Sequence, residues 1–103
     1  MAPSIQIRVY RIKPGKMRES LDGWTRGVVP LRRKHGFRIL GAWVSEPGDK
    51  FVWILSYDGP QGFEAADAAY YATEDRKVLD PDPAVHVAHG EKWFVLEVPL
   101  ESA

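Results

Sequence analysis

The sequence predicts a single α+β domain with the ferredoxin-like order strand, helix, strand, strand, helix, strand (βαββαβ). The chain has 103 residues, of which 45% are apolar, and this suits one hydrophobic core over residues 1–103. Four segments alternate apolar and polar side chains, as strands do, and two segments repeat apolar residues every three or four positions, as helices do. The compact arrangement of these elements is a four-stranded antiparallel sheet with both helices on one face.

The first strand and the first helix have clear periods. Residues 4–12 alternate between apolar and polar side chains until a Pro-Gly pair ends the strand. Residues 16–35 place five apolar side chains on one helical face: Met17, Leu21, Trp24, Val28 and Leu31. Pro30 should kink or break this helix near its C-terminal end, and Gly36 should close it with a left-handed cap.

The second half of the chain predicts a hairpin, a helix and a last strand. Residues 37–57 alternate on both sides of a turn at 46–49, which indicates a hairpin. The Ala-rich segment 61–72 favours a second helix. Prolines exclude a helix over 80–83, and a strand follows over about 91–98, with its start left open.

Alternation divides the strand residues into two sets of opposite character. The first set is almost entirely aliphatic: Ile5, Ile7, Val9, Leu40, Ala42, Val44, Val52, Ile54, Phe94, Leu96 and Val98. The second set combines aromatic rings with hydrogen-bonding groups: Gln6, Arg8, Tyr10, Trp43, Trp53, Leu55, Tyr57, His89, Glu91 and Trp93. The assignment depends on the register, because a shift of one residue exchanges the two faces of a strand.

Neither of these faces suits exposure to water. Two helices cover only one face of such a sheet, and an exposed apolar face of this extent exceeds what monomers usually tolerate. We therefore predict a homodimer with two-fold symmetry in which the aliphatic faces of two sheets pack together. The aromatic and polar set would then lie beneath the helices, where a small-molecule cleft can form.

The composition excludes several classes of function. Lys and Arg number 14 and Asp and Glu number 14, so a formal charge of zero gives no reason to expect nucleic acid or an anionic membrane as partner. The absence of cysteine excludes disulfides, thiolate nucleophiles and Cys-ligated metal centres. No apolar run approaches the ~18 residues of a membrane span. The first residues lack the features of a secretory signal, so we expect a cytoplasmic protein.

Three segments, taken together in their order and spacing, resemble the NIPSNAP family. They are Ile7–Lys16, Gly36–Trp43 and Val52–Asp58, and the likeness covers about residues 5–80. The resemblance implies the dimeric α+β barrel superfamily, which includes cofactor-independent monooxygenases, polyketide cyclases, lactone isomerases, haem-degrading enzymes and chlorite dismutase-like proteins. It also implies a site in the cleft between sheet and helices of each protomer.

Arg8 is the first candidate site residue, because it lies on a strand face that we expect beneath the helices. In one interpretation its guanidinium holds a carboxylate, an enolate or a phenolate. In the alternative interpretation it is structural. It then pairs with Glu64, Glu91 or Glu97, or it stacks on an aromatic ring.

Aromatic side chains supply the other candidates. Tyr10 and Tyr57 can each donate a hydrogen bond or transfer a proton, and the alternative is an ordinary core tyrosine. Five further rings can stack on a planar ligand: Trp24, Trp43, Trp53, Tyr70 and Trp93. The alternative for each of them is core packing, and the small alanines of the second predicted helix fit either interpretation.

The sequence favours neither a metal nor a cofactor. His86 and His89 are three positions apart, so on a strand they point to opposite faces and cannot share one ion. Among the relatives that the resemblance implies, the haem-degrading enzymes use a histidine on the second helix. The second predicted helix of this chain has none.

Three functional hypotheses follow. In the first, a homodimer binds a small, planar, anionic metabolite and acts as a cofactor-independent monooxygenase, cyclase or isomerase. Arg8 holds the anion, Tyr10 or Tyr57 donates or relays a proton, and the tryptophans stack on the rings. In the second, the protein is a non-enzymatic dimeric interaction or ligand-sensing module whose cleft is filled by its own side chains. A third hypothesis, a haem-linked protein, predicts a Soret band.

Overall fold

A computed structural model describes residues 3–101 of the chain. Its elements follow in this order: β1 (Ser4–Ile12), α1 (Met17–Gly23), the π-helical turn η1 (Trp24–Val28), α2 (Val29–Lys34), β2 (Arg38–Val44), β3 (Lys50–Tyr57), α3 (Phe63–Ala72), α4 (Glu74–Lys77), the 3-10 turn η2 (Pro83–His86) and β4 (Val87–Val95). The predicted α+β order is confirmed, with short helical turns added to it.

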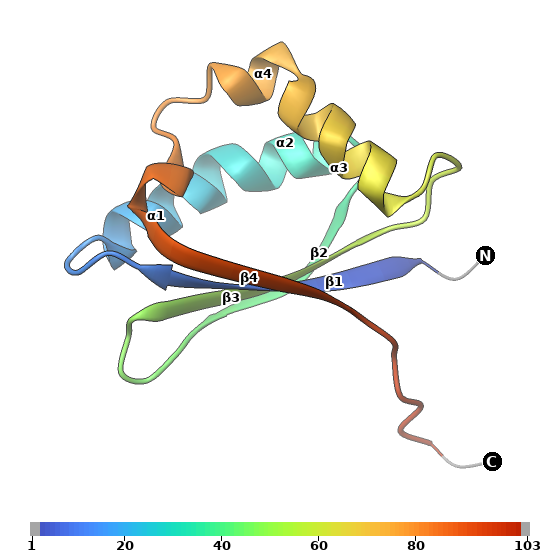
Figure 1. The fold of residues 1–103 in the computed structure, drawn as a ribbon, viewed down its shortest axis with the longest axis horizontal. Coiled ribbons are helices and arrows are strands. Elements are labelled where there is room, and N and C mark those ends of the chain that lie inside the picture. Colours follow the sequence, from blue (N-terminus) through green and yellow to red (C-terminus); the bar gives the residue numbers. More distant parts are fainter. Residues whose placement is uncertain (1–2, 102–103) are drawn as a thin grey trace.

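The four strands form one antiparallel sheet with the order β2-β3-β1-β4. All the helices lie on the same face of this sheet, and the opposite face is left open (Figure 1). This is the predicted ferredoxin-like arrangement, in which β1 and β3 are the central strands and β2 and β4 are the edges. The space between the helices and the sheet is therefore lined by side chains from both the strands and the helices.

The first helical segment changes its winding in the middle rather than breaking. The π-helical turn η1 lies between α1 and α2, directly before Pro30. Proline has no N–H to donate to the preceding turn, so the regular α-helical hydrogen-bond pattern cannot continue across it. Gly36 has φ of +88°, so the left-handed cap predicted from the sequence is confirmed.

The core lies between the sheet and the helices. Its buried apolar residues come from the helix-facing side of β1 and β3, from η1 and α3, and from the residue before β2: Ile12, Val28, Phe37, Phe51, Trp53, Leu55, Tyr57, Phe63, Ala66 and Tyr70. Leu55 is 0% exposed and Trp53 is 2% exposed. Burial of large aromatic side chains is therefore the main apolar contribution that holds the helices on the sheet.

A bulge in β2 corrects the predicted face of Trp43. Ile39 lies opposite Leu55, but Gly41 lies opposite Ile54, so the register shifts at Leu40. An extra residue in one strand exchanges the faces of all residues that follow it. Trp43 therefore lies on the open face and is 55% exposed. The prediction that it lies beneath the helices was wrong, as was the placement of Ala42 and Val44 on the open face, since their cross-strand partners are the core residues of β3.

The register of β4 is also opposite to the prediction. Trp93 pairs with Ile7 across the ladder, so its indole belongs to the open face, where it is 49% exposed. Phe94 pairs with Gln6 on the helix-facing side, and its ring lies 5.1 Å from that of Phe63. His89 and Glu91 likewise pair with open-face residues of β1, and Leu96 and Val98 lie beyond the end of the strand.

The open face of the sheet is apolar over much of its area, but its members differ from the predicted set. It carries aliphatic side chains from β1 and β3 and two indoles from the outer strands: Ile5, Ile7, Val9, Trp43, Val52, Ile54, Trp93 and Val95. Trp43 and Trp93, which the sequence analysis placed beneath the helices, therefore belong to the open face. Among residues 3–101, no helix has the length and apolar character needed to cross a membrane.

Candidate functional site

A cavity of about 340 Å³ lies between the helices and the sheet. Its wall is formed by residues of both central strands, the helices and the η2 turn: Tyr10, Ser20, Trp24, Val28, Arg32, Phe51, Trp53, Tyr70, Tyr71, Arg76, Pro83, Ala84 and Val87. The indoles of Trp24 and Trp53 meet edge to face at a centroid distance of 5.4 Å. The volume falls within the range of small-molecule pockets.

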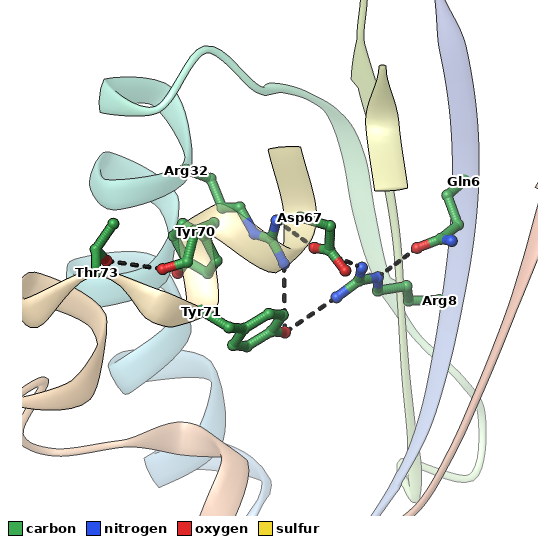
Figure 2. Close-up of polar contacts among 7 residues, drawn as sticks. All are labelled: Gln6, Arg8, Arg32, Asp67, Tyr70, Tyr71 and Thr73. Atoms are coloured by element: carbon green, nitrogen blue, oxygen red, sulfur yellow. Dashed lines mark hydrogen bonds and ion pairs between the residues drawn. The ribbon is translucent and has the colours of Figure 1, made fainter. Parts of the chain in front are cut away.

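Two arginines, one carboxylate and one phenol form a closed cluster beside this cavity (Figure 2). Arg8 Nη2 and Arg32 Nη1 both donate to Asp67 Oδ1, at 3.0 and 2.7 Å. The other terminal nitrogen of each guanidinium donates to the hydroxyl oxygen of Tyr71, at 3.2 and 3.3 Å. Each guanidinium therefore spans the same two oxygen atoms.

Three elements bring this cluster together. Strand β1 presents Arg8 on its helix-facing side, between Gln6 and Tyr10. Helix α2 supplies Arg32, and helix α3 supplies both Asp67 and Tyr71. The two α3 residues are four positions apart and so lie on the same side of that helix. The cluster consequently connects strand β1 of the sheet to both α2 and α3.

The two guanidinium groups are almost completely buried, with Arg8 at 2% and Arg32 at 0% exposure. A buried charge is costly unless it is paired and hydrogen-bonded. Arg32 lies over the ring of Tyr70 at 3.9 Å and over that of Phe37 at 4.6 Å, measured from Cζ to the ring centroids. Arg8 Nε donates to Gln6 Oε1 at 2.7 Å. Polar and aromatic partners thus meet both guanidinium groups, although Arg32 Nε has no hydrogen-bond partner among residues 3–101.

The cluster carries more positive than negative charge. Burial disfavours the cation of Arg8, but the neighbouring Tyr10, Tyr71 and Asp67 outweigh that effect and hold the pKa of Arg8 above its ordinary value. Two guanidinium groups share the single carboxylate of Asp67. One positive charge beside the cavity therefore has no counter-ion within the cluster.

The wall of the cavity is rich in hydrogen-bond donors. Five buried donor atoms have no hydrogen-bond partner among residues 3–101 and belong to wall residues: Trp24 Nε1, Trp53 Nε1, Tyr70 Oη, Arg32 Nε and Arg76 Nε. Burial raises the pKa of Tyr70 above its ordinary value, although Arg32 and Arg76 oppose the shift, so this hydroxyl keeps its proton. Arg76 also pairs with Asp82 at 3.1 Å, which neutralises its charge. These donor atoms are buried within the wall residues, behind the surface of the cavity.

The structure places four of the predicted site residues in the cavity wall: Tyr10, Trp24, Trp53 and Tyr70. Arg8 lies beside the cavity, behind the wall, in an ion pair. Its carboxylate partner is Asp67, and not one of the glutamates that the sequence suggested. The interpretation of Arg8 as a direct clamp on a ligand therefore gives way to a structural pairing, and Arg32 takes the place in the wall.

The other predicted site residues lie elsewhere. Tyr57 pairs with Ser4 at one end of the ladder, whereas Tyr10 pairs with Phe51 towards the other end, so the two phenols are not neighbours. Tyr57 packs on the ring of Phe37 at 5.1 Å, outside the cavity wall. Trp43 and Trp93 lie on the open face, as described above.

The histidines do not form a metal site. His86 Nε2 lies 3.6 Å from Glu19, and His89 Nε2 lies 3.7 Å from Glu91 on the open face. Within residues 3–101, no three His, Cys, Asp or Glu side chains are placed to share a metal ion.

Sequence reasoning missed Arg32, Asp67 and Tyr71. A signal for the first two is present in the helical spacing. Arg32 follows Val28 by four positions and Asp67 follows Phe63 by four, so each places a charge on the predicted apolar face of its helix. A charged residue on such a face needs a buried partner. Tyr71 extends the same row by another four positions.

The chain matches a protein-family model described as NIPSNAP over residues 5–99. The chain belongs to the NIPSNAP family. The resemblance inferred from three strand segments is therefore confirmed, and it extends through β4 as well. Among curated proteins, no significant match to this NIPSNAP chain is found.

Solved structures similar to this NIPSNAP chain share its fold. An uncharacterized NIPSNAP domain protein from Burkholderia xenovorans is 20% identical, with a TM-score of 0.79 over 97% of this chain and 99% of that one. A NIPSNAP family protein of unknown function from Agrobacterium tumefaciens is 18% identical, with a TM-score of 0.83 over 96% of this chain and 91% of that one. A putative antibiotic biosynthesis monooxygenase from Bacteroides thetaiotaomicron is 17% identical, with a TM-score of 0.72 over 98% and 95% of the two chains. The fold is thus shared with proteins of the monooxygenase type.

Proposed function

We propose that this protein binds a small, planar organic anion in the cavity between its sheet and its helices. The observation that carries the proposal is the uncompensated positive charge of the Arg8, Arg32 and Asp67 cluster beside the cavity. An anion there gains a counter-charge and hydrogen bonds in a site of low dielectric, where both are stronger than in water.

The shape of the wall supports a planar ligand. The ring of Trp24 packs edge to face against those of Phe51 and Trp53, at centroid distances of 5.0 and 5.4 Å. Rings in this arrangement present both flat faces and edges to a neighbouring molecule. A ligand of one or two fused rings would fill the cavity of about 340 Å³ with room for polar substituents.

The same arrangement suits chemistry through an enolate or a phenolate. A fixed positive charge stabilises such an anion without rearrangement when it forms, and a protonated phenol can return a proton to it. Tyr70 keeps its proton because of burial, and Tyr10 is a second phenol in the wall. We propose a cofactor-independent reaction of this kind, as a monooxygenase, cyclase or isomerase. The fold shared with a putative antibiotic biosynthesis monooxygenase supports this choice.

We also propose that the protein is a homodimer formed through the open face of the sheet. Eight apolar side chains of that face, two of them tryptophans, have no covering element within residues 3–101. A contiguous apolar surface of this kind is typical of a protein interface. Two copies related by a two-fold axis would bury it on both sides at once.

Binding can be tested with a pair of planar probes. The first is 2-hydroxy-1,4-naphthoquinone, which is an anion at neutral pH, and the second is its neutral 2-methoxy analogue. We expect calorimetric titration to show at least tenfold tighter binding of the anion, which corresponds to about 1.4 kcal/mol. Equal affinity for the two probes would contradict the proposed role of the positive charge.

A variant that fills the cavity provides the matched control. Ala84 lines the cavity and its side chain is exposed, so Ala84→Trp should occupy the space without disturbing the core. We expect this variant to unfold at the temperature of the wild type and to lose affinity for the anion. Unchanged affinity would place the binding site elsewhere. Binding without turnover of any enolisable substrate would favour the non-enzymatic, ligand-sensing alternative.

A further inference from the structure

The hydroxyl of Tyr71 has its two acceptor positions filled and its hydrogen free. A phenol oxygen offers two lone pairs and one hydrogen. Arg8 Nη1 and Arg32 Nη2 donate to the two lone pairs, at 3.2 and 3.3 Å. Within residues 3–101 the hydrogen of this hydroxyl has no acceptor, since Tyr71 accepts in both of its hydrogen bonds. The remaining hydrogen therefore has only one role left, which is to donate outside the cluster.

The side chain of Tyr71 borders the cavity and is accessible. It belongs to the cavity wall and is 43% exposed. Its ring meets that of Tyr70 edge to face at 5.1 Å, and the guanidinium of Arg76 lies over it at 5.4 Å. Two guanidinium groups on the oxygen and two neighbours on the ring hold the phenol in one position.

We propose that Tyr71 is the residue that donates a hydrogen bond to an anionic oxygen of the ligand, and that Arg8 is a positioning residue that acts through it. This inference rests on the proposed function, since it names the donor that meets the ligand in the same cavity. It adds a specificity rule: the ligand carries an enolate or phenolate oxygen that reaches α3. A guanidinium that donates to the phenol oxygen polarises its O–H bond and strengthens the bond that this hydrogen makes.

Arg8 differs from Arg32 in its relation to the cavity. Arg32 is a wall residue, whereas Arg8 is not. Arg8 contacts two wall residues: its Nη1 donates to Tyr71, and its guanidinium lies over the ring of Trp53 at 5.6 Å. Its hydrogen bond to a wall residue is thus the one to Tyr71. Lysine in its place keeps the charge but has a single nitrogen, so it cannot span both oxygen atoms. The variant Arg8→Lys therefore separates positioning from charge.

The test is a double-mutant cycle on the affinity for 2-hydroxy-1,4-naphthoquinone. A hydrogen bond to a charged group contributes about 1.5 to 3 kcal/mol, so Tyr71→Phe should weaken binding by tenfold or more. Arg8→Lys should weaken binding in the wild type but change it less than twofold in the Tyr71→Phe background, because the donor it positions is then gone. The visible absorption band of the bound anion should shift in both single variants, since it depends on hydrogen bonds to the probe oxygens.

Each outcome has a distinct meaning. If the wild type binds no probe, the proposed function fails together with this inference. If the wild type binds and Tyr71→Phe binds equally well with an unshifted band, the assignment of Tyr71 fails while the cavity keeps its function. If Arg8→Lys weakens binding equally in both backgrounds, Arg8 does not act through Tyr71. Thermal unfolding of each variant without probe identifies a loss of affinity that comes only from loss of the fold. If Arg8→Lys does not fold, the affinity and the absorption band of Tyr71→Phe, which retains the ring, decide the assignment of Tyr71.

Discussion

Arg8 and Arg32 donate to the same two oxygen atoms, Asp67 Oδ1 and the hydroxyl oxygen of Tyr71, although they come from a strand and a helix. The four distances lie between 2.7 and 3.3 Å. A carboxylate normally offers two oxygens to a guanidinium, and here a phenol supplies the second one. The two arginines therefore share one negative charge instead of two, and this excess of positive charge is the basis of the proposed preference of the cavity for an anion.

Removal of the shared carboxylate should destabilise the fold. Asp67→Asn leaves two buried guanidinium groups without a counter-charge, and breaking a buried ion pair in this way costs about 3 kcal/mol. We expect urea unfolding to show a lower midpoint with an unchanged slope. The matched control is Asp75→Asn, since Asp75 pairs with Lys34 at 2.6 Å on the exposed surface. Equal effects of the two substitutions would mean that the cluster contributes no more than a surface pair.

The alkaline limit of stability should depend on Tyr70. Burial raises the pKa of this phenol above its ordinary value of 10.0 in the folded protein. Between the unfolded and the folded pKa the native state binds the extra proton, so stability is complete below pH 10 and falls as the pH rises above it. Tyr70→Phe should remove this part of the alkaline loss. Thermal melting between pH 9 and pH 11 of both proteins tests it, and parallel curves would contradict the assignment.

The order of the elements could be predicted because each one follows a local period. Strand β1 and the long first helix show their periods within 20 residues or fewer, and Gly36 ends the helix where a left-handed residue is required. The faces of the outer strands could not be predicted in the same way. The bulge at Leu40 reverses the face of Trp43, and no feature of an alternating sequence marks where an extra residue falls.

The part of the site that follows a local period could also be predicted. Trp24 and Trp53 lie on faces fixed by a local period, and both line the cavity. The pairing of Arg32 with Asp67 joins residues 35 positions apart on two different helices, so it depends on tertiary packing that no single segment encodes. What the sequence does show is a charge on each of two apolar faces. This indicates a buried partner without identifying it.

The left-handed cap makes a further prediction about stability. Gly36 has φ of +88°, and a Cβ there would lie 3.4 Å from the ring of Tyr57. A residue with a Cβ is strained in this conformation, so Gly36→Ala should cost about 1 kcal/mol. Gly48→Ala serves as control, since its added Cβ meets nothing closer than 3.7 Å and its φ is not in the left-handed region. Chemical denaturation of the two variants should separate them, and equal stability would show that the helix end adapts.

The open face of the sheet makes the last prediction, which concerns assembly. Ile7 lies in the middle of β1, paired with Ile54 on one side and Trp93 on the other, so it is near the centre of the apolar surface. Native mass spectrometry of the wild type should show a mass of twice the 11.7 kDa chain. Ile7→Glu would place an unpaired charge at the centre of each dimer interface, in two copies that face each other, and should give the monomer.

The control for this prediction is Val78→Glu. Val78 is also an exposed apolar residue, at 63%, but it lies at the end of α4 on the helical side of the molecule. The dimer should persist in this variant because only the sheet face is buried by assembly. A monomeric wild type, or a dimer that survives Ile7→Glu and not Val78→Glu, would show that the open face is not the interface. In that case the exposed indoles of Trp43 and Trp93 would need a different partner, since an apolar surface of this size is seldom left in water.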